Sequence, residues 1–142
     1  AAFGLLQLQY IDQAMVRRKA IDTRYRQALA EIKGLRCLTG VGEVVANYAY
    51  FPILVEADFP LSRDALFQKF RDQNIYVRRY FYPLISDFSM YRGLPSAAPA
   101  NLPVARRMAE QVLCLPIYPD LQDVELETVL TVLQDVYSGH VD

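Results

Sequence analysis

Residues 58–83 read DFPLSRDALFQKFRDQNIYVRRYFYP and place a helix pattern directly before a strand pattern. Ser62 is a suitable N-cap, and Asp64 falls in the first turn, where the helix dipole favours a carboxylate. Three apolar side chains share one helical face and are expected to be buried: Leu66, Phe67 and Phe70. Asn74 can adopt the left-handed conformation that ends a helix. The β-branched and aromatic residues that follow predict a strand that stops at Pro83.

Two further patterns precede this pair. Residues 2–33 form the longest helical segment, and Gly34 is placed to end it. Its apolar stripe consists of Ile11, Met15, Ile21, Tyr25, Leu29 and Ile32. Residues 44–55, VVANYAYFPILV, predict a strand that is covered on both faces. Pro52 lacks a backbone N–H and therefore indicates an edge strand or a bulge at that position.

The rest of the chain predicts irregular connections and short elements. Residues 86–103 hold three prolines and a glycine, which indicates a long irregular connection. Residues 104–121 predict a short helix and then a brief strand that ends at Pro116. A last helix has apolar residues at helical spacing: Leu126, Val129, Leu130, Leu133, Val136 and Tyr137. This order predicts an α+β fold, a small and mainly antiparallel sheet with helices packed on one side, preceded by a long N-terminal helix.

Composition excludes several classes of function. The 142 residues carry a net charge of −1, so no long-range positive field attracts nucleic acid or an anionic membrane. Cys37 and Cys114 lie in apolar surroundings, and His140 is the one histidine, so neither a metal site nor a Cys–His nucleophile is expected. No apolar run is long enough for a membrane span, and no signal peptide is visible, so we expect a cytoplasmic protein.

The strand after Asn74 contains the main candidate binding residues. Alternation puts Tyr76, Arg78, Tyr80 and Tyr82 on one face, and Val77, Arg79, Phe81 and Pro83 on the other. An arginine among tyrosines suits a ligand with phosphate oxygens and flat or hydroxylated rings. A half-exposed edge strand, with arginine stems covering apolar surface, fits the same composition. No acid/base pair, phosphate-binding loop or nucleophile motif accompanies these residues, so the sequence offers no self-contained catalytic set.

Four segments resemble the C-terminal part of the DegT/DnrJ/EryC1/StrS aminotransferase family. They are AAFGLLQLQYIDQAMVRRKAIDTRYRQAL (1–29), NYAYFPILV (47–55), NIYVRRYFYPLISDFSMYRGLP (74–95) and LPVARRMAEQVLCLPIYPDLQDVELETVLTVL (102–133). The family pattern near the arginine is approximately G-I-x-T-R-x-F-F-Y-P-L-H. Asn74 stands for its glycine, Arg78 matches its arginine, and Tyr80 to Leu84 cover the aromatic-proline run. Ile85 departs from the pattern, because many members have histidine there.

The resemblance implies a pyridoxal-phosphate-dependent enzyme that moves an amino group from glutamate onto a nucleotide-linked keto-deoxy sugar. NYAYFPI and RRYFYPL look most like members that act on dTDP-linked sugars for bacterial O-antigens or related glycans. The resemblance implies the C-terminal domain of a fold-type I aminotransferase, with Arg78, Tyr80 and Tyr82 as candidate substrate-binding residues. It implies no catalytic, cofactor-binding or metal-binding residue in this chain, because the family's Schiff-base lysine lies in a large N-terminal domain.

We therefore expect a fragment of a longer enzyme, inactive by itself and without bound pyridoxal phosphate. Residues 1–142 would form one domain, in which residues 1–34 lead to the missing domain and residues 35–142 form the small domain. The expected partners are that missing domain, a second subunit in a homodimer, and the nucleotide sugar. One alternative is a non-catalytic binding or dimerisation module of aminotransferase ancestry. Another is a binder of single-stranded nucleic acid, which the net charge disfavours.

Overall fold

A computed structural model describes residues 2–39 and 45–139. Its helices are α1 (Ala2–Leu8), α2 (Ile11–Leu29), α3 (Arg63–Asp72), α4 (Pro103–Gln111) and α5 (Asp123–Ser138). Its strands are β1 (Leu35–Cys37), β2 (Phe51–Val55) and β3 (Val112–Leu115). The connection after α3 contains three short 3-10 turns, at Ile85–Asp87, Pro95–Ala97 and Pro99–Asn101. No helix of the described part is long and apolar enough to cross a membrane.

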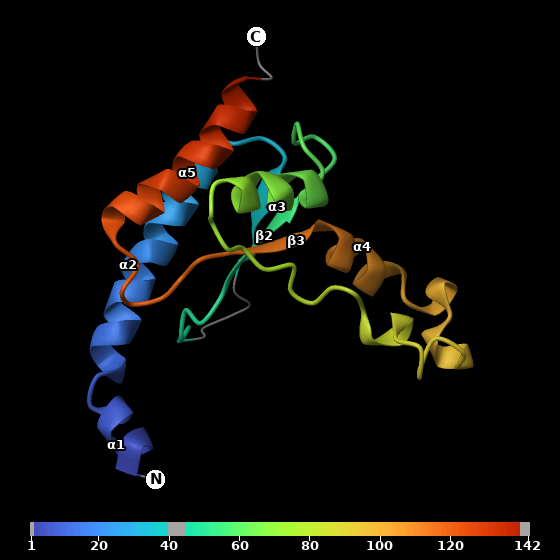
Figure 1. Ribbon diagram of the computed structural model, residues 1–142, viewed down its shortest axis with the longest axis horizontal. Coiled ribbons are helices and arrows are strands. Elements are labelled where there is room, and N and C mark those ends of the chain that lie inside the picture. Colours follow the sequence, from blue (N-terminus) through green and yellow to red (C-terminus); the bar gives the residue numbers. More distant parts are fainter. Residues whose placement is uncertain (1, 40–44, 140–142) are drawn as a thin grey trace.

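The three strands form an antiparallel sheet in the order β1-β2-β3. Phe51, Ile53 and Val55 alternate along β2 and point into the core together with Leu113 and Leu115 of β3. Figure 1 shows α2 and α5 lying side by side, with α3 near the sheet. The core is built between this face of the sheet and the apolar sides of α2, α3 and α5. The predicted α+β class, with an antiparallel sheet and core helices on one side, is confirmed.

The helix ends follow the local sequence. The Ser62 hydroxyl accepts a hydrogen bond from the backbone N–H of Ala65 at 3.2 Å, which confirms the predicted N-cap of α3. Asn74 has a φ of 59°, as expected for a left-handed residue after a helix. At α5, the Glu125 side chain accepts from the Gln122 backbone N–H and completes a capping box.

The N-terminal helical segment is not one continuous helix. Hydrogen bonds from the N–H of Gln9 to Leu6 and of Tyr10 to Gln7 form a tight turn that separates α1 from α2. The helix also ends at Leu29, before Gly34, although Gly34 does have a positive φ of 84°. None of the side chains of α1 is buried, so no core packing keeps α1 on the axis of α2. The predicted helix over residues 2–33 is therefore confirmed for residues 2–8 and 11–29, and it is wrong at the turn of residues 9–10 and after Leu29.

The first predicted strand is shorter than expected. β2 begins at Phe51, residues 45–50 have no regular structure, and residue 44 lies outside the described residues. β2 is also the central strand, so the edge-strand interpretation of Pro52 was wrong. β1 pairs only with residues 53–55, however, so Pro52 has a strand neighbour on one side only. Proline has no backbone N–H, and at position 52 there is no β1 residue that would need one as a hydrogen-bond donor.

The predicted strand after Asn74 is reduced to one bridge. Arg78 pairs with Cys114 of β3, through N–H to carbonyl hydrogen bonds of 3.1 and 2.8 Å in the two directions. The chain turns away from the sheet at Tyr80 and Phe81. The bridge is short, yet it fixes which way Val77 and Arg78 point.

A candidate binding site on the outer face of the sheet

Val77 and Arg78 point to opposite sides of the sheet. Val77 is 5% exposed and belongs to the core cluster. Arg78 shares a face with Cys114 and Pro52, because residues paired across strands lie on the same side. This outer face is covered in part by α4, which lies beside β2, and Leu54 is buried there. The part near Arg78 is open.

A hollow of about 320 Å³ lies on this open part. Arg78 lines it together with Ala49, Tyr50, Tyr76, Cys114, Leu115, Pro116, Ile117 and Tyr118. None of these lining residues is acidic, and within residues 2–39 and 45–139 the Arg78 guanidinium has no ion pair. Arg26, Arg36 and Arg106 by contrast each pair with a carboxylate. The hollow therefore carries an unneutralised positive charge beside aromatic rings.

Tyr50 and Tyr80 form a hydroxyl pair at the rim of this hollow. Their hydroxyl oxygens lie 2.9 Å apart, and their ring centroids are 4.8 Å apart. The hydrogen bond with Tyr50 is the main cause that raises the pKa of Tyr80. Tyr50 reaches this place because the Asn47 side chain accepts from the Ala49 N–H at 3.1 Å, which forms a local turn before β2.

Cys114 lies under Arg78 and is almost fully buried. Burial raises the pKa of its thiol to about 11, although the nearby Arg78 charge acts in the opposite direction. The thiol is therefore protonated at neutral pH and behaves as a small apolar surface. This agrees with the interpretation of Cys114 as a packing residue.

Tyr82 lies away from the face of Arg78, so the predicted grouping of four residues on one face is wrong. The Arg63 guanidinium lies 4.7 Å from the Tyr82 ring centroid, and that of Arg79 lies 5.3 Å away. Both arginines also donate to Asp64, at 2.8 and 3.1 Å. The grouping fails because strand alternation ends where the chain turns at residues 80 and 81. The structure brings Tyr76, Arg78 and Tyr80 together and leaves Tyr82 in a separate network.

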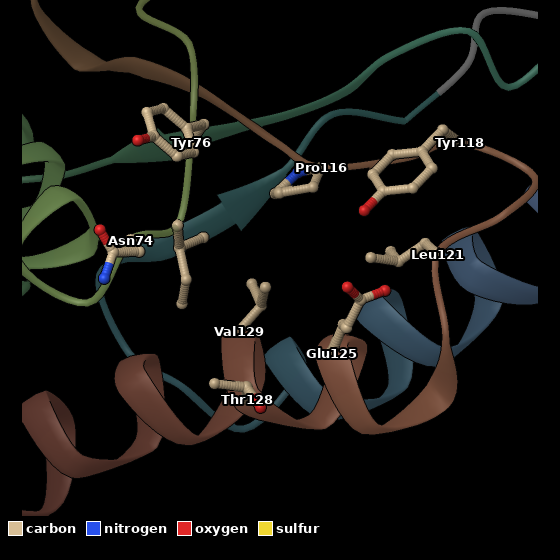
Figure 2. A pocket seen from close by; sticks show the side chains of 9 residues that line it. Asn74, Tyr76, Pro116, Tyr118, Leu121, Glu125, Thr128 and Val129 are labelled. Carbon is tan, nitrogen blue, oxygen red and sulfur yellow. The ribbon is translucent and has the colours of Figure 1, made fainter.

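A second hollow of about 310 Å³ adjoins the first (Figure 2). Tyr76, Pro116 and Tyr118 line both hollows and so mark the boundary between them. Glu125 and Val129 of α5 point up into the second hollow, Thr128 also lines it, and the Tyr118 hydroxyl is directed toward Leu121 and Glu125. Burial is the main cause that raises the pKa of Tyr118, and the Glu125 and Asp120 charges add to it. The second hollow is therefore lined by the acidic Glu125, whereas the first is lined by the basic Arg78.

Sequence reasoning missed two residues of this region. Tyr50 shares an alternation pattern with Pro52, but its place beside Tyr80 depends on a contact between segments 30 residues apart. Arg63 is 4% exposed, which a charged residue in the first turn of a helix did not suggest. Its guanidinium donates to the carbonyl oxygens of Ala109 and Val112, at 2.7 and 3.2 Å.

The lysines of the chain do not fit a Schiff-base site. Such a lysine is desolvated, so that its amine becomes nucleophilic. Lys19 and Lys69 are exposed on helices, and Lys33 pairs with Asp58 at 3.3 Å with its side chain 74% exposed. The described residues thus make a surface suited to binding, without a nucleophile for carbonyl chemistry.

This fold recurs in sugar aminotransferases. The structure of DesI in the presence of its TDP-sugar product superposes with a TM-score of 0.85 and 25% identity, over 97% of this chain and 35% of DesI. The PLP form of the putative sugar aminotransferase Spr1654 from Streptococcus pneumoniae shares the fold with a TM-score of 0.81. It is 23% identical, and the match covers 96% of this chain and 34% of Spr1654. The chain therefore shares its fold with about a third of each of these two proteins.

The sequence places the chain more narrowly. It belongs to the DegT/DnrJ/EryC1/StrS aminotransferase family, whose sequence model matches residues 1–134. It is 48% identical over 123 residues to the dTDP-4-amino-4,6-dideoxy-D-glucose transaminase of Escherichia coli. That match covers 87% of this chain and 33% of the relative, so the chain spans about a third of the length of that curated protein. The resemblance noted from the sequence is confirmed at the level of the family.

Proposed function

We propose that this chain is the C-terminal domain of a pyridoxal-phosphate-dependent aminotransferase that converts a dTDP-linked keto-deoxy sugar, with glutamate as amino donor. The product would serve O-antigen or related glycan synthesis. The proposal rests on the family match and on the 48% identity to the E. coli transaminase. In this proposal, pyridoxal phosphate is held by the missing N-terminal domain and supplies the amino-transfer chemistry.

The structural observation that carries the proposal is the Arg78 guanidinium, which pairs with no carboxylate of the described residues and lies in an aromatic hollow that no acidic residue lines. A guanidinium matches the oxygens of a phosphate with two parallel hydrogen bonds. Tyrosines can stack on a flat ring and hydrogen-bond to sugar hydroxyls. In this role the chain binds and orients the nucleotide sugar, with Arg78, Tyr80 and Tyr76 on one wall. Tyr82 remains a proposed contact only if a neighbouring domain extends the site toward it.

A variant of Arg78 tests this role. In the complete protein, Arg78→Gln should raise the KM for the dTDP sugar about tenfold or more, because a charge-assisted contact is lost. The KM for glutamate should not change. Arg107→Gln is the matched control, since Arg107 is exposed on α4 and outside both hollows. Equal kinetics for Arg78→Gln and the wild type would remove Arg78 from the site.

A second candidate is a non-catalytic binding or dimerisation module. The exposed lysines favour it, because the described chain has no group for the Schiff base. An absorbance spectrum of the complete protein with pyridoxal phosphate separates the two. A Schiff-base band that changes on addition of glutamate supports the enzyme, and a spectrum of free pyridoxal phosphate supports the module.

A further inference from the structure

The hydroxyl pair of Tyr50 and Tyr80 adds a residue to the proposed site. Tyr50 immediately precedes β2, the central strand, so its backbone is attached to the most constrained part of the sheet. Tyr80 lies on the turning segment after the Arg78 bridge and has fewer backbone constraints. Within the described chain, the Tyr50 hydroxyl is the side-chain partner of the Tyr80 hydroxyl. The position of the Tyr80 hydroxyl therefore depends on Tyr50.

The pair also has a defined hydrogen-bonding capacity. In a hydrogen bond between two hydroxyls, one oxygen donates and the other accepts, and the accepting hydroxyl keeps its own hydrogen. One O–H donor thus remains available for a ligand, next to the Arg78 guanidinium.

We propose that Tyr50 is a positioning residue that orients the Tyr80 hydroxyl toward a hydroxyl or phosphate oxygen of the nucleotide sugar. The proposal rests on the proposed function of the hollow. Tyr50 lines the hollow directly, whereas Tyr80 reaches it through the pair, so the two hydroxyls act as one unit beside Arg78. Their rings pack at 4.8 Å, so replacing either residue by phenylalanine removes the hydroxyl and keeps the packing.

A double-mutant cycle in the complete protein tests this inference. Tyr50→Phe and Tyr80→Phe should each raise the KM for the dTDP sugar about three- to tenfold, with the KM for glutamate and the cofactor spectrum unchanged. The KM of the double variant for the dTDP sugar should be little higher than that of either single variant, because the first substitution already breaks the hydrogen bond between the two hydroxyls. Tyr137→Phe is the control, since Tyr137 lies on α5 outside both hollows.

The outcomes separate the two proposals. If Arg78→Gln impairs sugar binding but Tyr50→Phe behaves like Tyr137→Phe, the positioning role is wrong and the proposed function stands. The positioning role is also wrong if the effects of Tyr50→Phe and Tyr80→Phe on the free energy of sugar binding are additive in the double variant. If the wild-type protein does not aminate a dTDP sugar, both proposals fail. If it does but Arg78→Gln has no effect, the hollow is not the sugar site and the positioning role fails with it.

Discussion

Arg63 and Arg78 are the same residue type with opposite environments. Arg63 is buried beside α4, where its guanidinium donates to two backbone carbonyls and to Asp64. Arg78 is exposed on the open face of the sheet, and no carboxylate of the described chain pairs with it. A buried guanidinium with all these partners holds structure together, whereas an exposed and unpaired one is available to a ligand.

We predict that Arg63→Met destabilises the protein. Methionine has a similar length but no donor, so the carbonyls of Ala109 and Val112 lose their partner. The expected loss is about 2–4 kcal/mol in the free energy of unfolding. Urea unfolding measures it, with Arg107→Met as an exposed control on α4. A loss equal to that of the control would show that Arg63 has no structural role.

At the scale of elements, local signals predicted helices better than strands. The limits of α3 followed from Ser62 and Asn74, because caps act within a few residues. The prediction of a strand after Asn74 was wrong in length, because composition does not tell how many of its residues pair with β3. The central place of β2 also depends on pairing with two distant strands. Strand length and order are set by tertiary contacts that no local pattern contains.

In the candidate site, too, local patterns predicted some features and tertiary contacts decided the others. Alternation correctly separated Val77 from Arg78, because the bridge preserves strand geometry for these two residues. It failed for Tyr82, beyond the turn at residues 80 and 81. Tyr50 comes from another segment and meets Tyr80 only after the sheet has formed. Residues at the bridge were thus accessible to prediction, whereas the position of Tyr82 beyond the turn and the distant partner Tyr50 were not.

Gly34 provides a prediction at the scale of elements. It links α2 to β1, its φ is 84°, and its carbonyl accepts from the Glu56 N–H at 2.8 Å. A methyl group at this position would lie 2.6 Å from the carbonyl carbon of Asp58. Gly34→Ala should therefore cost about 1–3 kcal/mol from backbone strain alone.

Thermal unfolding of Gly34→Ala and Gly93→Ala provides the comparison. A side chain at Gly93 would meet nothing within 4 Å, so this variant should be close to the wild type. Equal melting temperatures for the two variants would contradict the role assigned to Gly34.

At the scale of the whole molecule, α1 and the start of α2 present apolar side chains to solvent. The exposed residues are Phe3, Leu5, Leu6, Leu8, Tyr10, Ile11 and Val16. Figure 1 shows α1 at the end of α2, away from the sheet. A contiguous apolar surface of this kind is typical of a contact with another domain or subunit. It supports the proposal that further polypeptide, or a second subunit, covers this segment.

We predict that the isolated 142-residue chain self-associates. Contact between exposed apolar surfaces removes them from water, which favours association. Sedimentation velocity should show a mass above that of the monomer at high concentration, and a double variant, Leu5→Glu with Leu6→Glu, should reduce it. Val124→Glu is a matched control, because Val124 is similarly exposed but lies on α5. A monomer at every concentration would contradict the prediction.

The opposite orientations of Val77 and Arg78 have a consequence for how substrate preference can diverge. Because the interior and the open face use alternate residues at the bridge, Arg78 can be exchanged without disturbing the hydrophobic interior, and Tyr50 and Tyr80 also lie outside the core cluster. Under the proposed function, a few outward-facing positions would set the selectivity for different sugars on the same scaffold. Under the same proposal, these positions are the natural targets for libraries that aim to change the preference of the complete protein among sugar nucleotides.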